Sequence, residues 1–180
     1  MTPAAFLDSV LAEQAKIFAA IPAGQVDRLC EALDSAKRVF VYGIGRNGLM
    51  LQGFAMRLAH LGIDAHFVGQ LSAPPAAKGD VLVLAVALGT LPTADAVAAA
   101  ARKAGARLAV VTARPAAVAH ADTIVELKAQ TMDDPPASTL PLGSAFELSL
   151  HLLCEHVTVE LMRRRKLDGA ALRARHANLL

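Results

Sequence analysis

The glycine-rich segment at residues 43–48 has the residue types and the spacing of an anion-binding turn. Its glycines are Gly43, Gly45 and Gly48, and they follow an apolar, β-branched run. An amphipathic pattern over residues 49–61 then predicts a helix. A strand that leads into a helix through Gly-x-Gly-x-x-Gly presents free N–H groups and the positive end of the helix dipole to a ligand. We therefore expect the protein to act on a phosphorylated molecule.

The same glycine spacing occurs in dinucleotide-binding folds, but two features of this chain argue against that class. A dinucleotide site needs an acidic residue at the end of the second strand. Here the second strand, predicted at residues 65–68, ends in Gly69 and Gln70. The turn also contains Arg46, and a guanidinium pairs well with a phosphate monoester, which carries more charge than a diester.

Alternating strands and helices must position this turn. Two helices are predicted first, over residues 3–20 and 24–35. Strand patterns follow at 38–42, 65–68, 81–86, 108–112 and 123–126, and helical patterns lie between them at 49–61, 93–104 and 115–119. This alternation predicts an α/β fold with a parallel sheet, helices on both faces and right-handed crossovers.

The last third of the chain is organised differently. Residues 127–143 show no periodicity and contain several prolines, which predicts a loop long enough to have a functional role. Ser144 is the predicted N-cap of a helix to about residue 166, and residues 168–180 form a short tail. We thus expect one domain over residues 1–180, with N-terminal helices (1–35), a sheet core (36–126), the loop (127–143), and a C-terminal helix and tail (144–180).

Ligands of open α/β sheets bind beyond the C-terminal ends of the strands, at the point where the strand order reverses. Four segments are delivered to that edge: the turn at 43–48, residues 69–72 with Ser72, a second glycine-containing loop at 87–90, and residues 112–114. The two glycine-containing loops lead into helices and are predicted to form two walls of one phosphosugar cradle.

Composition excludes several classes of function. Hydrophobic residues make up 54% of the chain and aromatic residues only 4%, which suits helices packed closely on a buried parallel sheet. A formal charge of +2 is too small for a nucleic-acid footprint, and no segment is apolar and long enough to cross a bilayer. Cys30 and Cys154 have neither disulfide-framework nor metal spacing, so core positions are expected for both. We expect a cytoplasmic protein without a signal peptide.

The only dense basic run is residues 163–166. It ends a predicted helix, where cations complement the dipole, and a solvated last turn is its simplest interpretation. Contacts within an oligomer are the alternative.

Several motifs resemble those of sugar isomerase (SIS) domains, and among them those of 6-phospho-3-hexuloisomerases. They are Phe40-Val41-Tyr42-Gly43-Ile44-Gly45-Arg46-Asn47-Gly48 with the helix after it, Lys78-Gly79-Asp80, Pro141-Leu142-Gly143-Ser144-Ala145-Phe146-Glu147, and the tail Arg175-His176-Ala177-Asn178-Leu179. The start of the Phe146-Glu147 helix and the tail are specific to the hexuloisomerase branch. The resemblance covers essentially the whole chain, in order.

The resemblance implies a flavodoxin-like three-layer α-β-α sandwich around a five-stranded parallel sheet. It also implies a homo-oligomer, a dimer or typically a tetramer, whose active sites are shared between subunits. The reaction implied interconverts 3-hexulose 6-phosphate and fructose 6-phosphate, as in the ribulose monophosphate pathway. No metal and no organic cofactor is implied, and no partner other than the phosphosugar and further copies of the chain.

Two departures from the family pattern concern the phosphate. Asn47 stands where the first motif usually has serine, and its amide NH2 can still donate a hydrogen bond. The second loop, normally Ser-Gly-Ser-Gly-Glu-Thr, is Ala-Leu-Gly-Thr-Leu-Pro-Thr at residues 87–93, so only Gly89, Thr90 and Thr93 are left to contact a phosphate. Either the substrate differs, or catalysis has weakened or been lost.

Moving a carbonyl between C3 and C2 requires a base that removes a proton from carbon and an acid that protonates oxygen. Glu147 is the candidate base, although Ser144-x-x-Glu147 is also the pattern of a capping box. His176 is the candidate acid, because imidazole titrates near neutrality, or else a solvated tail residue. His60 is a third catalytic candidate, and a cation at the C-terminus of its helix is its plain alternative.

The phosphate is expected at the first turn, on Gly43, Gly45, Arg46, Asn47 and Gly48, and at the second loop. Arg46 has a further alternative as an ion-pair residue of a subunit interface. Ser72 either contacts the substrate or has a capping or turn role in its own loop. The leading hypothesis is therefore an isomerase of hexuloisomerase type; a non-catalytic phosphosugar-binding protein and an isomerase of another sugar phosphate are the alternatives.

Overall fold

The computed structural model of the protein describes residues 1–179. Its elements follow in chain order: α1 (Pro3–Ala19), α2 (Gln25–Asp34), β1 (Val39–Gly43), α3 (Arg46–His60), β2 (Ala65–Phe67), β3 (Val81–Ala85), α4 (Pro92–Lys103), β4 (Arg107–Thr112), the 3₁₀ helix η1 (Pro115–Val118), β5 (Thr123–Glu126), α5 (Ser144–Arg164) and α6 (Gly169–Arg173). Strands and helices alternate as predicted, with bounds that differ by at most three residues.

The five strands form one parallel sheet in the order β2-β1-β3-β4-β5. This is the flavodoxin-like order, and the direction of strand addition reverses between β1 and β3. The two strands run in register to their ends, where Gly43 of β1 lies beside Ala85 of β3. The segments that follow β1 and β3 therefore leave the sheet side by side, at its switch point.

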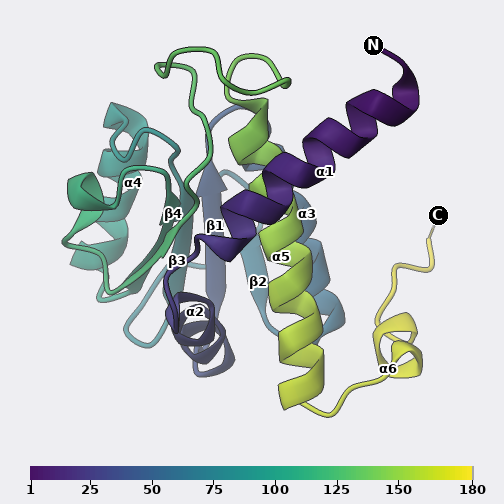
Figure 1. The fold of residues 1–180 in the computed structure, drawn as a ribbon. Coiled ribbons are helices and arrows are strands. Elements are labelled where there is room, and N and C mark those ends of the chain that lie inside the picture. The colour runs from purple at the N-terminus through teal and green to yellow at the C-terminus, as the bar shows by residue number, and fades with distance from the viewer. Residues whose placement is uncertain (180) are drawn as a thin grey trace.

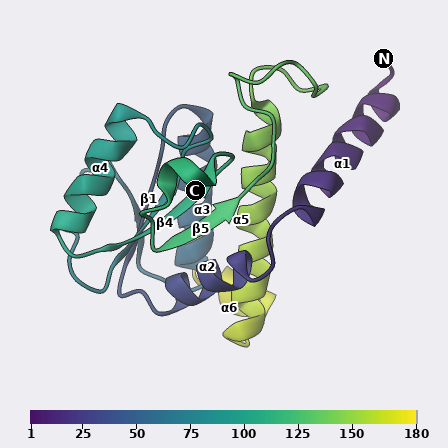
Figure 2. The same ribbon diagram turned by 60° about the vertical axis from the view of Figure 1, so that its left-hand side comes forward.

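Each face of the sheet has its own core, because neighbouring side chains of a strand point to opposite faces. On one face Val39, Val41, Val81 and Val83 pack with α2, α3 and α5. On the other face Phe40, Leu82 and Leu84 pack with the alanines of α4. Figures 1 and 2 show α4 on one side of the sheet and α5 on the other. The predicted three-layer α-β-α sandwich around a five-stranded parallel sheet is confirmed.

Helix α1 lies against α5 and projects beyond the body of the molecule (Figure 1). Its buried Gln14 accepts a hydrogen bond from the Ser149 hydroxyl at 2.7 Å and donates to the Ala145 carbonyl at 3.4 Å. A buried amide needs such partners, since an unpaired polar group in a core costs about 1–3 kcal/mol. These bonds fix α1 at the N-terminal half of α5.

Two sequence predictions about local structure were wrong, and one short helix was not predicted. Helix α3 begins at Arg46 rather than Leu49, because Gly48 and Leu49 both donate to the Gly45 carbonyl and close the first turn there. The N-cap of α5 is Gly143 and not Ser144. The tail holds a short helix, α6, capped by Asp168, whose carboxylate accepts the N–H of Ala171 at 2.8 Å.

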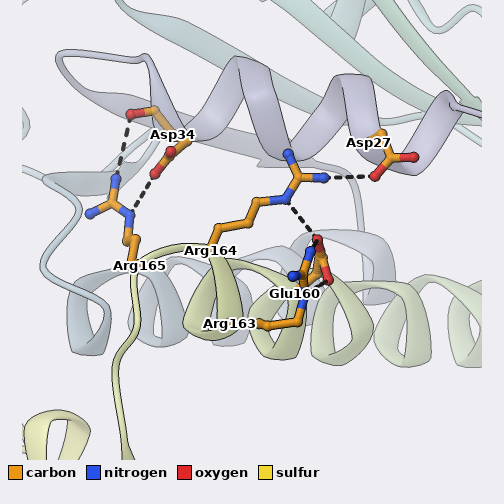
Figure 3. Close-up of polar contacts among 6 residues, drawn as sticks. All are labelled: Asp27, Asp34, Glu160, Arg163, Arg164 and Arg165. Atoms are coloured by element: carbon orange, nitrogen blue, oxygen red, sulfur yellow. Dashed lines mark hydrogen bonds and ion pairs between the residues drawn. The ribbon is translucent and has the colours of Figure 1, made fainter.

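The arginines of the basic run at the end of α5 form ion pairs within the chain (Figure 3). Arg164 bridges Glu160 at 2.8 Å and Asp27 of α2 at 2.6 Å, and Arg165 pairs with Asp34 at 2.7 Å. These contacts join the ends of α5 and α2.

Both cysteines are buried core residues, as predicted. Burial raises the pKa of the Cys30 thiol to about 11, and it raises that of Cys154 as well. Neither thiol is therefore suited to act as a nucleophile near neutral pH. Within residues 1–179 no helix is sufficiently long and apolar to span a membrane.

Candidate functional site

The three glycines of the first turn have different structural roles. A Cβ on Gly48 would lie 2.4 Å from the Gly43 carbonyl oxygen, and a Cβ on Gly43 would lie 2.9 Å from the Gly48 nitrogen. These two glycines let the start of α3 contact the end of β1 directly. Gly45 has φ +59°, which favours glycine, and the space beside it is open. The turn is therefore closely packed where Gly43 meets Gly48 and has an accessible surface beside Gly45.

The accessible surface carries unused hydrogen-bond donors. Among the described residues, the N–H groups of Arg46 and Asn47 donate to no backbone carbonyl. Unpaired donors at a helix N-terminus, together with the helix dipole, form a site for an anion. The predicted phosphate-binding chemistry of this turn is thus sterically available.

The side chain of Arg46 contacts the beginning of α5. Its Nε lies 2.8 Å from Oε2 of Glu147, Nη1 donates to the Ser144 hydroxyl at 3.1 Å, and Nη2 donates to the Leu142 carbonyl at 3.3 Å. Three contacts on a planar guanidinium leave little rotational freedom to Arg46 or to the carboxylate of Glu147. The candidate phosphate ligand and the candidate base, predicted separately, therefore form one unit.

This unit changes the interpretation of Ser144 and Glu147. A capping box requires the Ser144 hydroxyl to accept an N–H of its own helix, but the structure has no side-chain cap at α5. Ser144 is the first helical residue, and its hydroxyl accepts from Arg46 instead. The capping-box alternative for Glu147 is wrong, because its carboxylate pairs with α3 and not with the cap N–H.

The chain before α5 is held in an unusual backbone conformation. Leu142 has φ +50° and Gly143 has φ +77°, both in the left-handed region. For a leucine this conformation costs on the order of 1 kcal/mol, and such strain is concentrated at functional sites. Here it aims the Leu142 carbonyl at Arg46 while its side chain stays exposed.

The second loop, residues 87–93, lies on the end of β4. The Ala87 carbonyl accepts from the Ala113 N–H at 3.1 Å, and a Cβ on Gly89 would lie 2.6 Å from the Ala117 Cβ. Gly89 is therefore needed for packing, with φ +86°. Thr90 and Thr93 are exposed at the sheet edge predicted for them.

Two features make the start of α4 a weaker anion site than the start of α3. Pro92 is the first helical residue and supplies no N–H. Asp95 lies in the first turn, where its negative charge opposes that of a phosphate. A phosphate held between the two loops would therefore depend mainly on the first turn.

The two candidate histidines contact each other and not Glu147. The rings of His60 and His176 stack with their centroids 5.1 Å apart. Burial lowers the pKa of His60, and His176 lowers it further. Arg46 begins α3 and His60 ends it, so the 15 residues of the helix separate them by about 20 Å. One copy of the chain cannot bring these histidines to its own Glu147.

Ser72 takes part in its own turn, where its hydroxyl accepts from the Gln70 amide at 2.8 Å. Sequence reasoning missed Ser144 as a partner of Arg46, and it missed the ion pair of Arg114 with Asp134 beside the second loop. No local signal marks either contact, because each joins segments far apart in the sequence. Within the described chain no three His, Cys, Asp or Glu side chains are placed to hold a metal ion.

Several curated relatives of the chain are named 3-hexulose-6-phosphate isomerase. No protein-family model matches the chain. A 3-hexulose-6-phosphate isomerase of Bacillus subtilis is 34% identical over 160 residues, which cover 86% of each chain. The protein of that name from Mycobacterium gastri is 36% identical over 177 residues, 96% of this chain and 89% of its own.

One of the similar solved structures is described with the same activity. A crystal structure from Methanococcus jannaschii, described as inferring a molecular function of 3-hexulose-6-phosphate isomerase, superimposes with a TM-score of 0.84. It is 30% identical in sequence, and the match covers 97% of this chain and 98% of that one.

Proposed function

The chain belongs to the family of 3-hexulose-6-phosphate isomerases, and we propose that it interconverts 3-hexulose 6-phosphate and fructose 6-phosphate with Glu147 as the base. The observation that carries the assignment is the Arg46–Glu147 unit. It places an oriented carboxylate next to the free N–H groups of a helix N-terminus at the switch point of the sheet. A phosphosugar anchored there would present its carbon atoms to the carboxylate.

The proposed reaction proceeds through a cis-enediol. Glu147 removes the proton from C2 of the 3-hexulose, the electrons form the C2–C3 double bond, and an acid protonates the oxygen on C3. The proton then returns to C3 while the oxygen on C2 becomes the carbonyl. Arg46 acts by fixing the carboxylate and by placing positive charge beside the phosphate and the enediol oxygens, which stabilises developing negative charge.

Isotope exchange tests this assignment. With fructose 6-phosphate in D2O, the wild-type protein should introduce deuterium at C3 as it forms the enediol. Glu147→Gln should lose roughly 10²–10⁴ in rate with little change in the calorimetric affinity for fructose 6-phosphate, since a general base contributes about that much. Activity that survives Glu147→Gln would assign the base to another residue.

Glu155→Gln is a matched control for that variant. Glu155 also lies on α5 and pairs with an arginine of α3, Arg57, at 3.0 Å, but two turns farther from the site. It should keep its rate. A wild-type protein that binds fructose 6-phosphate without exchange would favour a second function, that of a phosphosugar-binding protein. The specific observation behind this second function is the altered α4 start with Pro92 and Asp95.

We further propose that the active site is completed by a second copy of the chain. In one copy His60 and His176 lie a full helix length from Glu147, so a neighbouring copy would have to supply them as the oxygen-protonating group. Large apolar side chains are available for the contact, exposed along α1, α3 and α5: Phe6, Leu7, Leu11, Leu49, Met56 and Val159. Burial of such surface is what stabilises subunit contacts.

Complementation between inactive variants tests the shared site. Glu147→Gln and His176→Gln should each be inactive, whereas mixed oligomers should recover about a quarter of the wild-type activity in the simplest dimer, because one site of each heterodimer is intact. Light scattering should show a mass above that of one chain. A monomeric protein, or mixtures that recover nothing, would remove the histidines from the mechanism.

The proposed reaction belongs to cytoplasmic sugar-phosphate metabolism, in the ribulose monophosphate pathway. A neighbouring gene for a 3-hexulose-6-phosphate synthase would support that placement.

A further inference from the structure

The carboxylate of Asp134, in the loop at 127–143, makes three polar contacts. Its Oδ2 accepts from the Thr131 N–H at 2.7 Å and from the Thr131 hydroxyl at 2.9 Å, and its Oδ1 pairs with Arg114. The hydrogen bonds from Thr131 and the guanidinium of Arg114 hold the pKa of Asp134 below its usual range. The carboxylate is therefore charged at neutral pH and keeps all of these contacts.

Thr131 in turn supports the beginning of α5. Its side chain is buried, and the backbone of Thr131 and Met132 lies directly against Gly143: a Cβ on Gly143 would lie 3.1 Å from the Met132 nitrogen and 3.4 Å from the Thr131 carbonyl carbon. Gly143 is the N-cap of α5, and Glu147 lies in the first turn of that helix. A shift of Thr131 would thus be transmitted to the carboxylate of Glu147.

On its other side, Asp134 is connected to the second loop. Arg114 follows β4, its N–H donates to the Thr112 hydroxyl at 3.0 Å, and its Cβ would lie 3.1 Å from a Cβ on Gly89. The pair of Arg114 with Asp134 therefore joins the loop that carries Gly89 to the loop that precedes Glu147. An exposed ion pair alone contributes little to stability. The two hydrogen bonds from Thr131 therefore contribute more than the Arg114 pair to anchoring Asp134.

We propose that Asp134 is a positioning residue for Glu147, acting through Thr131 and Gly143, with Arg114 linking the same anchor to the second loop. The proposal rests on the proposed function, because it assigns Glu147 as the base that Asp134 positions. A displacement of a catalytic group by about 1 Å is enough to lower a rate by up to two orders of magnitude. Asp134 itself does not touch the substrate in this assignment.

Kinetics of Asp134→Ala test the proposal, with Asp133→Ala as the matched control. Asp133 is the adjacent acid, is exposed and makes no ion pair within residues 1–179. Asp134→Ala should lower kcat about tenfold or more with KM changed less than about twofold, and Asp133→Ala should change neither. Arg114→Ala, which leaves the Thr131 bonds in place, should lower kcat by less than Asp134→Ala. An unchanged kcat in Asp134→Ala would overturn the proposal.

A double variant distinguishes positioning from general structural damage. If Asp134 acts through Glu147, adding Asp134→Ala to Glu147→Gln should lower the residual rate no further, because the group that it positions is already absent. Losses that multiply in the double variant would mean that Asp134 acts elsewhere, and would overturn the proposal.

Amide hydrogen exchange gives a readout that does not depend on isomerase activity. Asp134→Ala should accelerate exchange in a peptide covering residues 143–149, while Asp133→Ala should not. If the wild-type protein catalyses no isomerisation, the proposed function fails, and this measurement still decides whether Asp134 fixes the start of α5. Unchanged exchange in that peptide would overturn the proposal whatever the activity.

Discussion

Arg46, the first residue of α3, pairs with Glu147 in the first turn of α5 at a distance of 2.8 Å between Nε and Oε2. The pair joins two helix N-termini at the carboxyl edge of the sheet, where the strand order reverses. A phosphate bound at the first turn would thereby lie beside a carboxylate whose orientation is fixed by the same arginine. Activity and binding should consequently depend on the same arginine.

Replacing Arg46 should affect both binding and rate. Arg46→Ala should weaken fructose 6-phosphate binding by about 1.5–3 kcal/mol in calorimetry, as expected for the loss of a charge-assisted contact. It should also lower kcat, because Glu147 loses the partner that orients it. Arg46→Lys should restore part of the binding but less of the rate, since an ammonium cannot make three planar contacts. Arg57→Ala, at the other α3–α5 pair, is the control, and equal effects at both arginines would contradict a special role for Arg46.

Two glycines of α3 should respond to alanine in opposite directions. Gly48→Ala places a Cβ 2.4 Å from the Gly43 carbonyl oxygen and should lower the free energy of unfolding by roughly 1–3 kcal/mol. Gly53→Ala adds a Cβ where no atom lies within 4 Å and should raise it by about 0.5–1 kcal/mol. Urea denaturation measures both. A destabilised Gly53→Ala would indicate that another copy of the chain packs on this part of α3.

The start of α4 should gain phosphate affinity when its negative charge is removed. Asp95→Asn should tighten fructose 6-phosphate binding by about 0.3–1 kcal/mol if the phosphate lies near this helix N-terminus. Asp8→Asn, an exposed acid on α1, makes the same change in net charge and should have no effect. Equal affinities for wild type and Asp95→Asn would place the phosphate on the first turn alone.

Stability should fall in mild acid because of His60. Its pKa is lowered by burial and by His176, so the unfolded chain binds the proton more readily than the folded one. The contribution is complete above the usual pKa of histidine and is lost as the pH falls from that value through the lower pKa of the folded state. Thermal unfolding at about pH 8 and about pH 5 should show a smaller difference for His60→Gln than for wild type. His151→Gln, at an exposed position of α5, should leave the difference unchanged; an undiminished loss in His60→Gln would contradict the assignment.

Much of the fold was determined by local sequence. Alternating β-branched runs and amphipathic segments identified all five strands and the helices between them, because period and turn chemistry are local properties. The glycine spacing of residues 43–48 located the tight turn between β1 and α3 for the same reason, since positive φ and close packing both exclude a side chain. The motif at residues 141–147 marked Glu147, although it could not say what the carboxylate contacts.

The tertiary structure alone decided which of these side chains contact each other. Ser144 and Glu147 have the spacing of a capping box, yet both turn to Arg46, which the sheet topology brings to the same edge. His60 and His176 were expected at the site, but the length of α3 separates them from Glu147 within one copy. Asp134 and Arg114 carry no motif and meet only because a long loop returns to the end of β4. Sequence patterns specify residue types and local geometry, whereas a contact between distant segments depends on how the strands are ordered and how the helices pack on them.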